Sequence, residues 1–494
     1  MKVLLVYPEY PDTFWSLKHA LRFFSKKASH PPLGLLTVAA LLPKPWQKKL
    51  VDMNVTSLKD EDLMWADYVF IGAMDIQRDS VEHTIERCKR LGVKIVAGGP
   101  LFTISHDQFD MVDHLVLNEA EVTLPLFLGD LEKGCAKHIY ASTELPDLSR
   151  TPIPAWDLID IKKYGVMSVQ YSRGCPFNCE FCSVVTLNGH IPRTKAKEQL
   201  LAEMEAVYAR GWRSSVFIVD DNFVGNKRKL KTEVLPAIVD WMTAKEYPFS
   251  FNTQASINIA DDDELLRLMS DAGFESVFIG IETPNDDSLQ ECGKLQNKGR
   301  DLVECVKKIH GCGIQVHGGF IVGFDNDPPS IFERQVSFIQ RSGIVTAMVG
   351  LLNAPRGTKL YQRLKQEDRL TSDMTGDNTD CSTNFVPKMP YETLVNGYKT
   401  VMNTLYSART HYERCKVLLS DYKTRRASVS RLRLEHFKAF AKTTWFLGIK
   451  DEGRRYYWQL LLWTLFRYPK YCGLAIGFQV SRYHFSKVAK NNSR

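Results

Sequence analysis

Short hydrophobic runs alternate with amphipathic stretches along residues 1–140. The pattern predicts buried strands at residues 3–6, 50–53, 68–72, 94–97 and 115–117. Between them, stretches such as residues 34–42, 81–90 and 120–131 repeat their apolar positions with the period of a helix. This alternation predicts an α/β domain with a Rossmann-like, doubly wound parallel sheet. Ligands bind such sheets at the carboxyl ends of the strands, so we expect a binding site in the loops there.

A second α/β domain is predicted at residues 165–385. Residues 141–164 precede it as a linker, because Pro146, Pro152 and Pro154 stand among polar residues. The expected strands lie at residues 167–172, 215–219, 249–254, 276–281, 315–322 and 346–351. Six parallel strands, each followed by a helix, predict a partial TIM-like (β/α)6 barrel. Its active site would lie at the carboxyl ends of the strands.

Residues 386–494 form a third part with a mainly helical pattern. Residues 411–494 carry 18 Lys and Arg against 5 Asp and Glu, so this part is basic, whereas the whole chain of 494 residues has a net charge of +7. A solvated basic surface and a module that meets an anionic partner both fit this charge.

Two apolar runs in the C-terminal part, at residues 456–466 and 471–480, are separated by Pro469 and Lys470. Each is too short to cross a bilayer. Aromatic residues beside Lys and Arg suit the membrane interface, while a helix hairpin packed on the barrel is the alternative. We expect no nucleic-acid partner, because no recognised RNA-binding module accompanies the basic residues.

The amino-terminal sequence begins as a strand, with no basic segment, long apolar stretch or cleavage site. It therefore predicts a cytoplasmic protein. Eleven cysteines in such a chain indicate metal binding rather than disulfides, since the cytosol is reducing.

Three cysteines follow the first predicted barrel strand at the spacing C-x3-C-x2-C: Cys175, Cys179 and Cys182. Thiolates are soft ligands that suit iron–sulfur clusters, and Phe181 before the last cysteine fits that interpretation. Three ligands leave one iron of a [4Fe–4S] cluster open for the amino and carboxylate groups of S-adenosylmethionine (SAM). Structural zinc is the alternative, but it needs a fourth ligand, and none lies nearby in the sequence.

With this motif and its three-part organisation, the chain resembles the cobalamin-binding radical SAM family. Within that family it most resembles the subgroup of hopanoid C-methylases. The resemblance implies a [4Fe–4S] cluster, SAM, cobalamin and an external electron donor of the flavodoxin or ferredoxin type. In this family the protein binds and orients cofactors that carry the difficult chemistry.

The resemblance also implies SAM-binding residues at the ends of later barrel strands. Candidates for the methionine amino group are Asp220 and Asp221, and less so Asn222; helix capping is the alternative role for these residues. Gln254 and Ser256 match a segment that faces SAM. Glu282 matches a residue that binds the ribose hydroxyls, and Gly323 closes the glycine-containing segment 318–323, which lets the backbone approach the adenine.

For cobalamin, the resemblance places Gly98, Gly99, Asn118 and Glu119 along the nucleotide tail. The loop at residues 7–15 lacks the histidine that binds cobalt in the best-known cobalamin domains, a departure that many family members share. Asn118 stands where relatives often have glycine. A retained fold without the cofactor is the alternative.

The reaction implied is radical methyl transfer to an unactivated carbon of a hydrophobic substrate, such as a lipid or terpenoid. An alternative is radical ring formation or carbon–carbon coupling without methyl transfer. A non-enzymatic cobalamin or redox sensor is a third possibility, which predicts a bound cluster but no cleavage of SAM.

Overall fold

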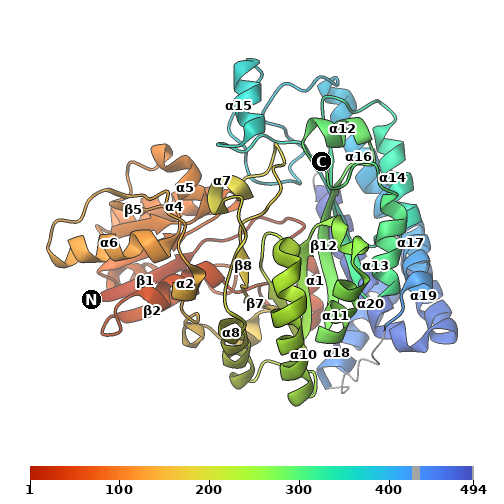
Figure 1. Cartoon of the computed structure of the whole chain (residues 1–494), viewed down its shortest axis with the longest axis horizontal. Helices are drawn as coiled ribbons and strands as arrows, with labels where there is room; N and C mark the ends of the chain where they lie inside the picture. Colours follow the sequence, from red (N-terminus) through yellow and green to blue (C-terminus); the bar gives the residue numbers. More distant parts are fainter. Residues whose placement is uncertain (425–433, 492–494) are drawn as a thin grey trace.

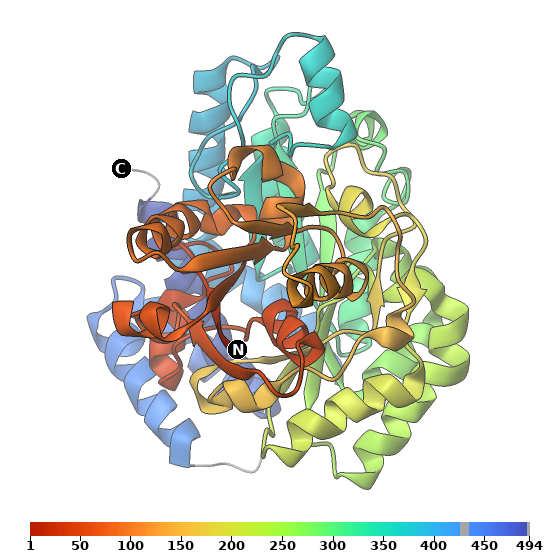
Figure 2. The ribbon, with the colours of Figure 1, turned by 90° about the vertical axis from the view of Figure 1, so that its left-hand side faces the viewer.

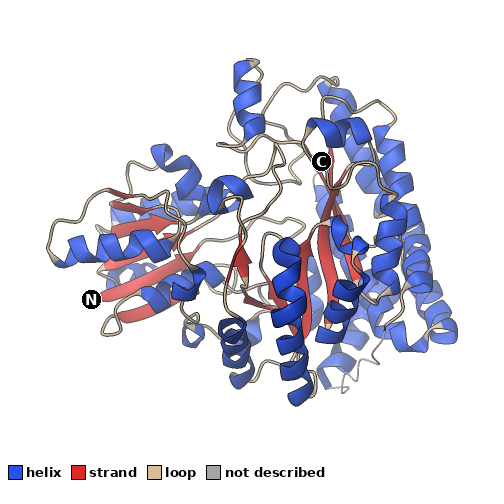
Figure 3. Ribbon diagram, viewed as in Figure 1, coloured by secondary structure: helices blue, strands red, loops and turns tan. Residues whose placement is uncertain are grey.

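Two parallel sheets with flanking helices and a helical C-terminal part make up the molecule (Figures 1 and 3). The structure is a computed structural model and describes residues 1–424 and 434–491. Both predicted sheets are present, and every pair of neighbouring strands within them is parallel. The predicted α/β fold class is therefore confirmed.

The N-terminal sheet has helices on both faces. Its strands lie in the order β2 (Gln47–Asp52), β1 (Lys2–Tyr7), β3 (Tyr68–Gly72), β4 (Lys94–Gly98), β5 (His114–Val116) and β6 (Ile139–Tyr140). Val3 and Leu5 point to the face covered by α2 (Leu33–Leu41) and α6 (Ala120–Glu132). Leu4 and Val6 point to the face covered by α3 (Asp60–Trp65), α4 (Arg78–Arg90) and α5 (Pro100–Ser105). This alternation produces the doubly wound arrangement. The two-residue strand β6 was not predicted.

The second sheet curves into an open, six-stranded barrel. Its strands lie in the order β14 (Ala347–Leu351), β13 (Gln315–Val322), β12 (Phe274–Glu282), β11 (Ser250–Ala255), β10 (Ser215–Ile218) and β7 (Met167–Val169). Its outer helices include α8 (Lys197–Ala209), α10 (Leu235–Ala244), α11 (Asp263–Ala272), α13 (Leu302–Gly311) and α14 (Ile331–Ser342). The prediction of one strand over residues 167–172 was wrong at its end. The chain leaves the sheet after Val169 and forms a short antiparallel hairpin, β8 (Ser172–Arg173) with β9 (Arg193–Thr194).

The linker, residues 141–164, crosses between the two sheets with three single-turn 3₁₀ helices. These are η4 (Leu148–Arg150), η5 (Trp156–Leu158) and η6 (Ile161–Lys163). Trp156 is buried, and the Tyr164 hydroxyl donates to Asp52 Oδ2 at 2.9 Å. The linker is therefore packed against the N-terminal sheet at its end.

The C-terminal part is helical over its described residues, as predicted. It contains α16 (Tyr391–Leu405), α17 (Ala408–Asp421), α18 (Leu434–Thr443), the π-helical η10 (Thr444–Lys450), α19 (Arg454–Arg467) and α20 (Cys472–Asn491). Figure 2 shows these blue helices along one edge of the molecule. Among the described helices, none combines the length and the apolar character needed to cross a membrane.

The last helix packs against a segment near the start of the chain. The ring of His484 on α20 donates from Nε2 to the carbonyl oxygens of Thr13 and Phe14, both at 3.1 Å. Burial lowers the pKa of His484 to about 4, so the ring is neutral at pH 7. Phe14 also packs against Phe485. The two ends of the sequence are thus joined in a buried contact.

Candidate active site

The three motif cysteines lie in one loop between β8 and α7 (Val184–Asn188), and all three are partly buried. Gly174 begins this loop with φ of 95°. A Cβ there would lie 2.9 Å from the Ile191 carbonyl oxygen, so only glycine fits. The Cys175 amide donates to the Gly189 carbonyl at 3.2 Å, which fixes the first cysteine.

The loop supplies three cysteine sulfurs, the ligand type that an iron–sulfur cluster takes. In the described part of the chain, no three or more His, Cys, Asp or Glu side chains are close enough to hold one metal ion. In a [4Fe–4S] cluster each cysteine binds a different iron, so the sulfurs need not converge on one point. Amide groups also point at the sulfurs: Asn222 Nδ2 lies 4.0 Å from Cys175 Sγ, and Gln296 Nε2 lies 3.9 Å from Cys179 Sγ.

A buried lysine, Lys294, accompanies the cysteines and was missed by the sequence analysis. Its Nζ lies 2.7 Å from Glu282 Oε1. Burial opposes its charge, but the attraction of Glu282 and Cys179 outweighs burial and raises the pKa of Lys294. The same cation lowers the cost of ionising Cys175 and Cys182, whose pKa values are raised by burial, that of Cys182 to about 11. A fixed positive charge beside three thiolates stabilises an anionic cluster.

A fourth cysteine, Cys292, lies behind the loop. Its carbonyl accepts the Glu180 amide at 2.8 Å, and its side chain is buried. Burial raises the pKa of Cys292 to about 12, so its side chain is a neutral thiol. The residue therefore serves packing.

The strand-end motif at residues 220–222 supports the cluster loop. Both oxygens of the buried Asp220 are engaged: Oδ1 accepts the Tyr171 amide at 2.8 Å and Oδ2 the Ser172 hydroxyl at 2.6 Å. Burial raises the pKa of Asp220 to about 7. Asp221 Oδ2 accepts the Gly174 amide at 2.9 Å.

Asn222 differs from its two neighbours, because its Oδ1 is buried without a hydrogen-bond partner among the described residues. A ligand group next to Cys175 could donate to that oxygen. Contact of Asp220, Asp221 or Asn222 with SAM stays a prediction, and the free acceptor now favours Asn222.

Glu282 ends β12 with φ of 66°, and its carboxylate turns back toward the strand. A Cβ on Gly280 would clash with Glu282 Oε1 and lie 2.8 Å from Lys294 Nζ. Gly280 therefore makes room for the ion pair of Glu282 and Lys294. The predicted contact of Glu282 with ribose is not tested by this arrangement.

The other predicted SAM residues lie on neighbouring strands. Gln254 is half-buried on β11, and the Ser256 hydroxyl donates to Asn258 Oδ1 at 2.7 Å. Gly323 follows β13 with φ of 105°, and its amide donates to Asp327 Oδ2 at 2.9 Å. The carboxyl ends of these strands share one end of the barrel with the cluster loop, as predicted. Phe181 packs on the other side of that loop against Phe324.

The predicted cobalamin residues lie at the carboxyl edge of the N-terminal sheet. A Cβ on Gly98 would approach the Val116 carbonyl oxygen to 2.6 Å, and Gly99 has φ of 94°, so packing alone demands glycine at both positions. Asn118 has φ of 63°, a conformation that asparagine tolerates better than most residues. This explains why asparagine can stand where relatives have glycine. Cobalamin contact by these residues stays a prediction.

Glu119 forms a buried ion-pair network with the cluster-loop hairpin. Its carboxylate binds Arg173 Nη1 and Arg193 Nη2, both at 2.5 Å, and Arg173 Nη2 lies 2.8 Å from Glu121 Oε1. Thr151 of the linker donates to the same Glu121 oxygen at 2.7 Å. The two arginines flank the cysteine loop in sequence. The network therefore fixes the loop to the N-terminal domain, and it is a contact that the sequence analysis did not foresee for Glu119.

Three further loops at the same edge of the N-terminal sheet also contact the barrel domain. Trp15 packs against Phe278 of β12 with ring centroids 5.1 Å apart. A Cβ on Gly376 would come within 2.6 Å of the Ile76 amide nitrogen, and Asp107 pairs with Arg356 at 3.0 Å. The carboxyl ends of the two sheets thus face each other.

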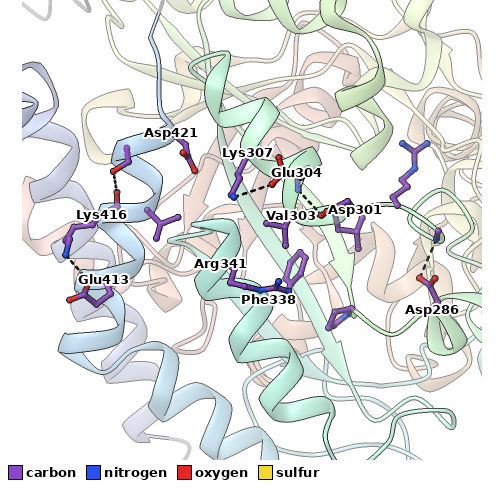
Figure 4. A pocket seen from close by; sticks show the side chains of 16 residues that line it. Asp286, Asp301, Val303, Glu304, Lys307, Phe338, Arg341, Glu413, Lys416 and Asp421 are labelled. Carbon is purple, nitrogen blue, oxygen red and sulfur yellow. Dashed lines mark hydrogen bonds and ion pairs between the residues drawn. The ribbon is translucent and has the colours of Figure 1, made fainter.

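A separate cavity lies away from the cysteine loop. It is an open groove of about 1050 Å³ between α13, α14 and α17 (Figure 4). Charged side chains line it and pair with each other, as Lys307 does with Glu304 at 3.3 Å and Lys416 with Glu413 at 3.0 Å. None of the predicted site residues lines this groove.

Comparison with known families agrees with the geometry. A family model described as the radical SAM superfamily matches residues 169–339, which hold the cysteine loop and β10 to β13. A model described as a domain of unknown function, DUF4070, matches residues 358–494.

Two relatives extend over nearly the whole chain. An uncharacterised methyltransferase of Synechocystis sp. is 41% identical over 464 residues, covering 93% of this chain and 86% of its own. The hopanoid C-2 methylase of Rhodopseudomonas palustris is 32% identical over 483 residues, covering 94% of this chain and 90% of its own.

Solved structures show the same fold at low identity. The cobalamin-dependent radical enzyme OxsB with aqua-cobalamin bound superposes with a TM-score of 0.63 at 14% identity, covering 99% of this chain and 80% of its own. The methyltransferase TsrM of Kitasatospora setae, with cobalamin and a [4Fe–4S] cluster bound, gives 0.64 at 13% identity over 100% of both chains. The chain belongs to the radical SAM methyltransferase family that includes these two relatives. It is an enzyme, and the radical SAM match implies a [4Fe–4S] cluster and SAM as cofactors, while the solved neighbours OxsB and TsrM bind cobalamin.

Proposed function

We propose that this enzyme transfers a methyl group to an unactivated carbon of a hydrophobic substrate, such as a lipid or terpenoid. The observation that carries the proposal is the ion-pair network of Glu119 with Arg173 and Arg193. It joins the cysteine loop to the edge of the sheet where cobalamin is expected. Two cofactors that act on one substrate carbon must be held at fixed positions around it, and in this proposal the network serves that purpose.

In this proposal Cys175, Cys179 and Cys182 bind the cluster, and Lys294 balances its negative charge. Residues that contact SAM are Asn222, Ser256, Glu282 and Gly323, and those that contact cobalamin are Gly98, Gly99 and Asn118. When bound, these cofactors supply the radical and the methyl group. The chain's own residues orient them and keep water away from the reacting centre.

Aromatic side chains on the inner face of the barrel support an apolar substrate. Phe278 of β12 packs against Trp15, and Phe217 of β10 packs against His30 with ring centroids 5.3 Å apart. Burial lowers the pKa of His30 to about 4, so this ring is neutral at pH 7. The R. palustris relative is named a hopanoid C-2 methylase, which supports a lipid substrate in this proposal.

The proposal also includes a cytoplasmic location, with contact at the membrane surface, and an electron donor of the flavodoxin or ferredoxin type. The cluster must be reduced before SAM is cleaved, and none of the predicted site residues supplies electrons.

The test is anaerobic purification with cobalamin supplied, followed by dithionite, SAM and a hopanoid or similar lipid. Bound corrinoid, 5′-deoxyadenosine release and a methylated lipid with two SAM consumed per turnover support the proposal. 5′-Deoxyadenosine with a rearranged but unmethylated product indicates ring formation or carbon–carbon coupling instead. A bound cluster without cleavage of SAM would indicate a sensor.

A further inference from the structure

Exposed apolar side chains gather on two consecutive helical segments of the C-terminal part. Their exposed fractions range from 39% to 83%. On α18 and η10 they are Phe437, Phe440, Trp445, Phe446 and Ile449, and on α19 they are Trp458, Leu462, Leu465 and Phe466. We name this set the C-terminal apolar face.

The two segments form one continuous surface. Trp458 Nε1 donates to the Gly448 carbonyl at 2.9 Å, which places the start of α19 against η10. On α19 the exposed positions recur three and four residues apart, so they share one stripe of the helix. Tyr457, Leu460 and Thr464 are buried on the opposite side of α19. The exposed apolar residues therefore form a contiguous stripe rather than scattered exposure.

Basic side chains accompany this face, and the described residues give them no carboxylate partners. Six exposed ones lie on the same elements and a seventh, Lys470, follows α19 on a 3₁₀ turn; the six are Lys438, Lys442, Lys450, Arg454, Arg455 and Arg467. No ion pair joins any of them to a carboxylate of the described residues. The two acidic residues between them are engaged, Asp451 with Arg482 and Glu452 with Lys490. Lys450 Nζ lies 5.2 Å from the centroid of the Trp445 ring, so cations and aromatics are interleaved.

We propose that the C-terminal apolar face docks on the surface of an anionic phospholipid bilayer. Interfacial helices bury Trp, Phe and Leu at the boundary between headgroups and acyl chains, while Lys and Arg pair with anionic headgroups. The helices lie in the interface, since no described helix can cross the membrane. A second copy of the chain fits less well, because a two-fold contact would bring two sets of seven unpaired cations together.

The segment of residues 15–24 connects this face with the inside of the barrel. Phe23 packs edge-on against Phe446 with ring centroids 5.9 Å apart, and Phe24 is 49% exposed beside it. Eight residues earlier in the chain, Trp15 packs against Phe278 on the barrel strand β12. If the substrate is a lipid, as the proposed function holds, docking brings the bilayer to this segment. The docking itself does not depend on the reaction.

The experiment is co-sedimentation of the full-length holoenzyme with vesicles of phosphatidylcholine alone or mixed with phosphatidylglycerol. We expect binding to the mixed vesicles that weakens with salt. The double variant Trp445→Ser/Phe466→Ser should bind at least about tenfold more weakly, because two aromatic groups no longer enter the interface. The double variant Lys442→Glu/Lys450→Glu should bind anionic vesicles more weakly, with a loss of affinity of about fivefold or more per substituted residue. Matched controls are Leu126→Ser, an exposed leucine on α6, and Lys133→Glu, both expected to bind as wild type.

Folding and cofactor loading of each variant are checked by iron and corrinoid content. The proposal is overturned if the wild type stays in the supernatant, or if both double variants bind as wild type does. It is also overturned if light scattering shows a dimer that the aromatic variant dissolves, since the occupant is then a second copy. An enzyme that binds vesicles but forms no methylated product would contradict the proposed function alone.

Discussion

Lys294 and Glu282 form a buried ion pair, with Nζ and Oε1 2.7 Å apart, at the end of the barrel where the cysteine loop lies. Neither side chain is more than 14% exposed. A buried charge without its partner is costly, so each residue depends on the other. The pair also sets the positive charge beside the three cysteines, which links the stability of the barrel to the chemistry of the cluster.

Lys294→Met should lower the free energy of unfolding by about 3–5 kcal/mol, because Glu282 is left buried and unpaired. Denaturant unfolding of the apo-protein measures this. The double variant Lys294→Met/Glu282→Gln should recover most of the loss. Lys308→Met is the control, since its ion pair with Asp263 is exposed and should matter by less than about 1 kcal/mol. Equal losses at Lys294 and Lys308 would contradict the interpretation.

Alanine at Cys175, Cys179 or Cys182 should prevent assembly of the cluster, since each sulfur is expected to bind its own iron. Iron and sulfide analysis after anaerobic reconstitution should fall from about four of each per chain to near background. Cys292→Ala should keep the full content, because this buried thiol packs behind the loop. A loss of iron in the Cys292 variant as large as in the motif variants would show that the fourth cysteine is a ligand.

Glu119→Gln should weaken the ion-pair network that connects the two domains. Arg193 loses its carboxylate partner and keeps only the carbonyls of Pro146 and Asn188. We expect a loss of about 3 kcal/mol in unfolding free energy and faster protease cleavage in the linker, residues 141–164. Glu198→Gln, at an exposed position beside Lys197, is the matched control. Unchanged linker cleavage in the Glu119 variant would argue against a joining role.

The burial of Asp327 should make the stability of the protein depend on pH. Burial raises the pKa of Asp327 from 3.8 to about 6, so folding favours the protonated carboxyl. Its contribution is fully present below about pH 4 and is lost as the pH rises through about 6. The free energy of unfolding of the wild type minus that of Asp327→Asn should therefore fall by about 3 kcal/mol between about pH 4 and about pH 7.

Asp325→Asn is the control for this titration. Burial alone would raise the pKa of Asp325, but hydrogen bonds from Arg369 and Arg363 outweigh it and hold the value at about 2. That contribution is fully present above the unfolded pKa and is lost only as the pH falls through about 2. The free energy of unfolding of the wild type minus that of Asp325→Asn should not change with pH above about pH 5. Parallel curves for the two variants would refute the assignment to Asp327.

The sequence predicted the strands well because each has a buried face: β3 is a continuous apolar run, and β13 alternates buried with partly buried positions. β3 (Tyr68–Gly72) and β13 (Gln315–Val322) agree with prediction at both ends. β6 (Ile139–Tyr140) was missed, since two residues carry no period. The end of β7 was misplaced because residues 170–172 continue its apolar and polar pattern while the chain already turns into the hairpin with β9.

The site was only partly predictable, for a different reason. The cysteine spacing is local, so the loop could be read from the sequence. The roles of Lys294, Glu119 and Asn222 depend on which loops meet across the two domains. Lys294 stands among other polar residues and gives no local signal. The one clue for Asn222 was its place after two acids at a strand end, where packing engages the acids and leaves the amide oxygen free.

The contact of His484 with the carbonyls of Thr13 and Phe14 has a consequence for synthesis. The partners are about 470 residues apart in sequence. At ribosomal rates, roughly 25–95 s pass between their emergence. Throughout that interval the segment with Trp15 lacks its contact with α20. A chain cut short before α20 would therefore leave the carbonyls of Thr13 and Phe14 without the donor that His484 supplies.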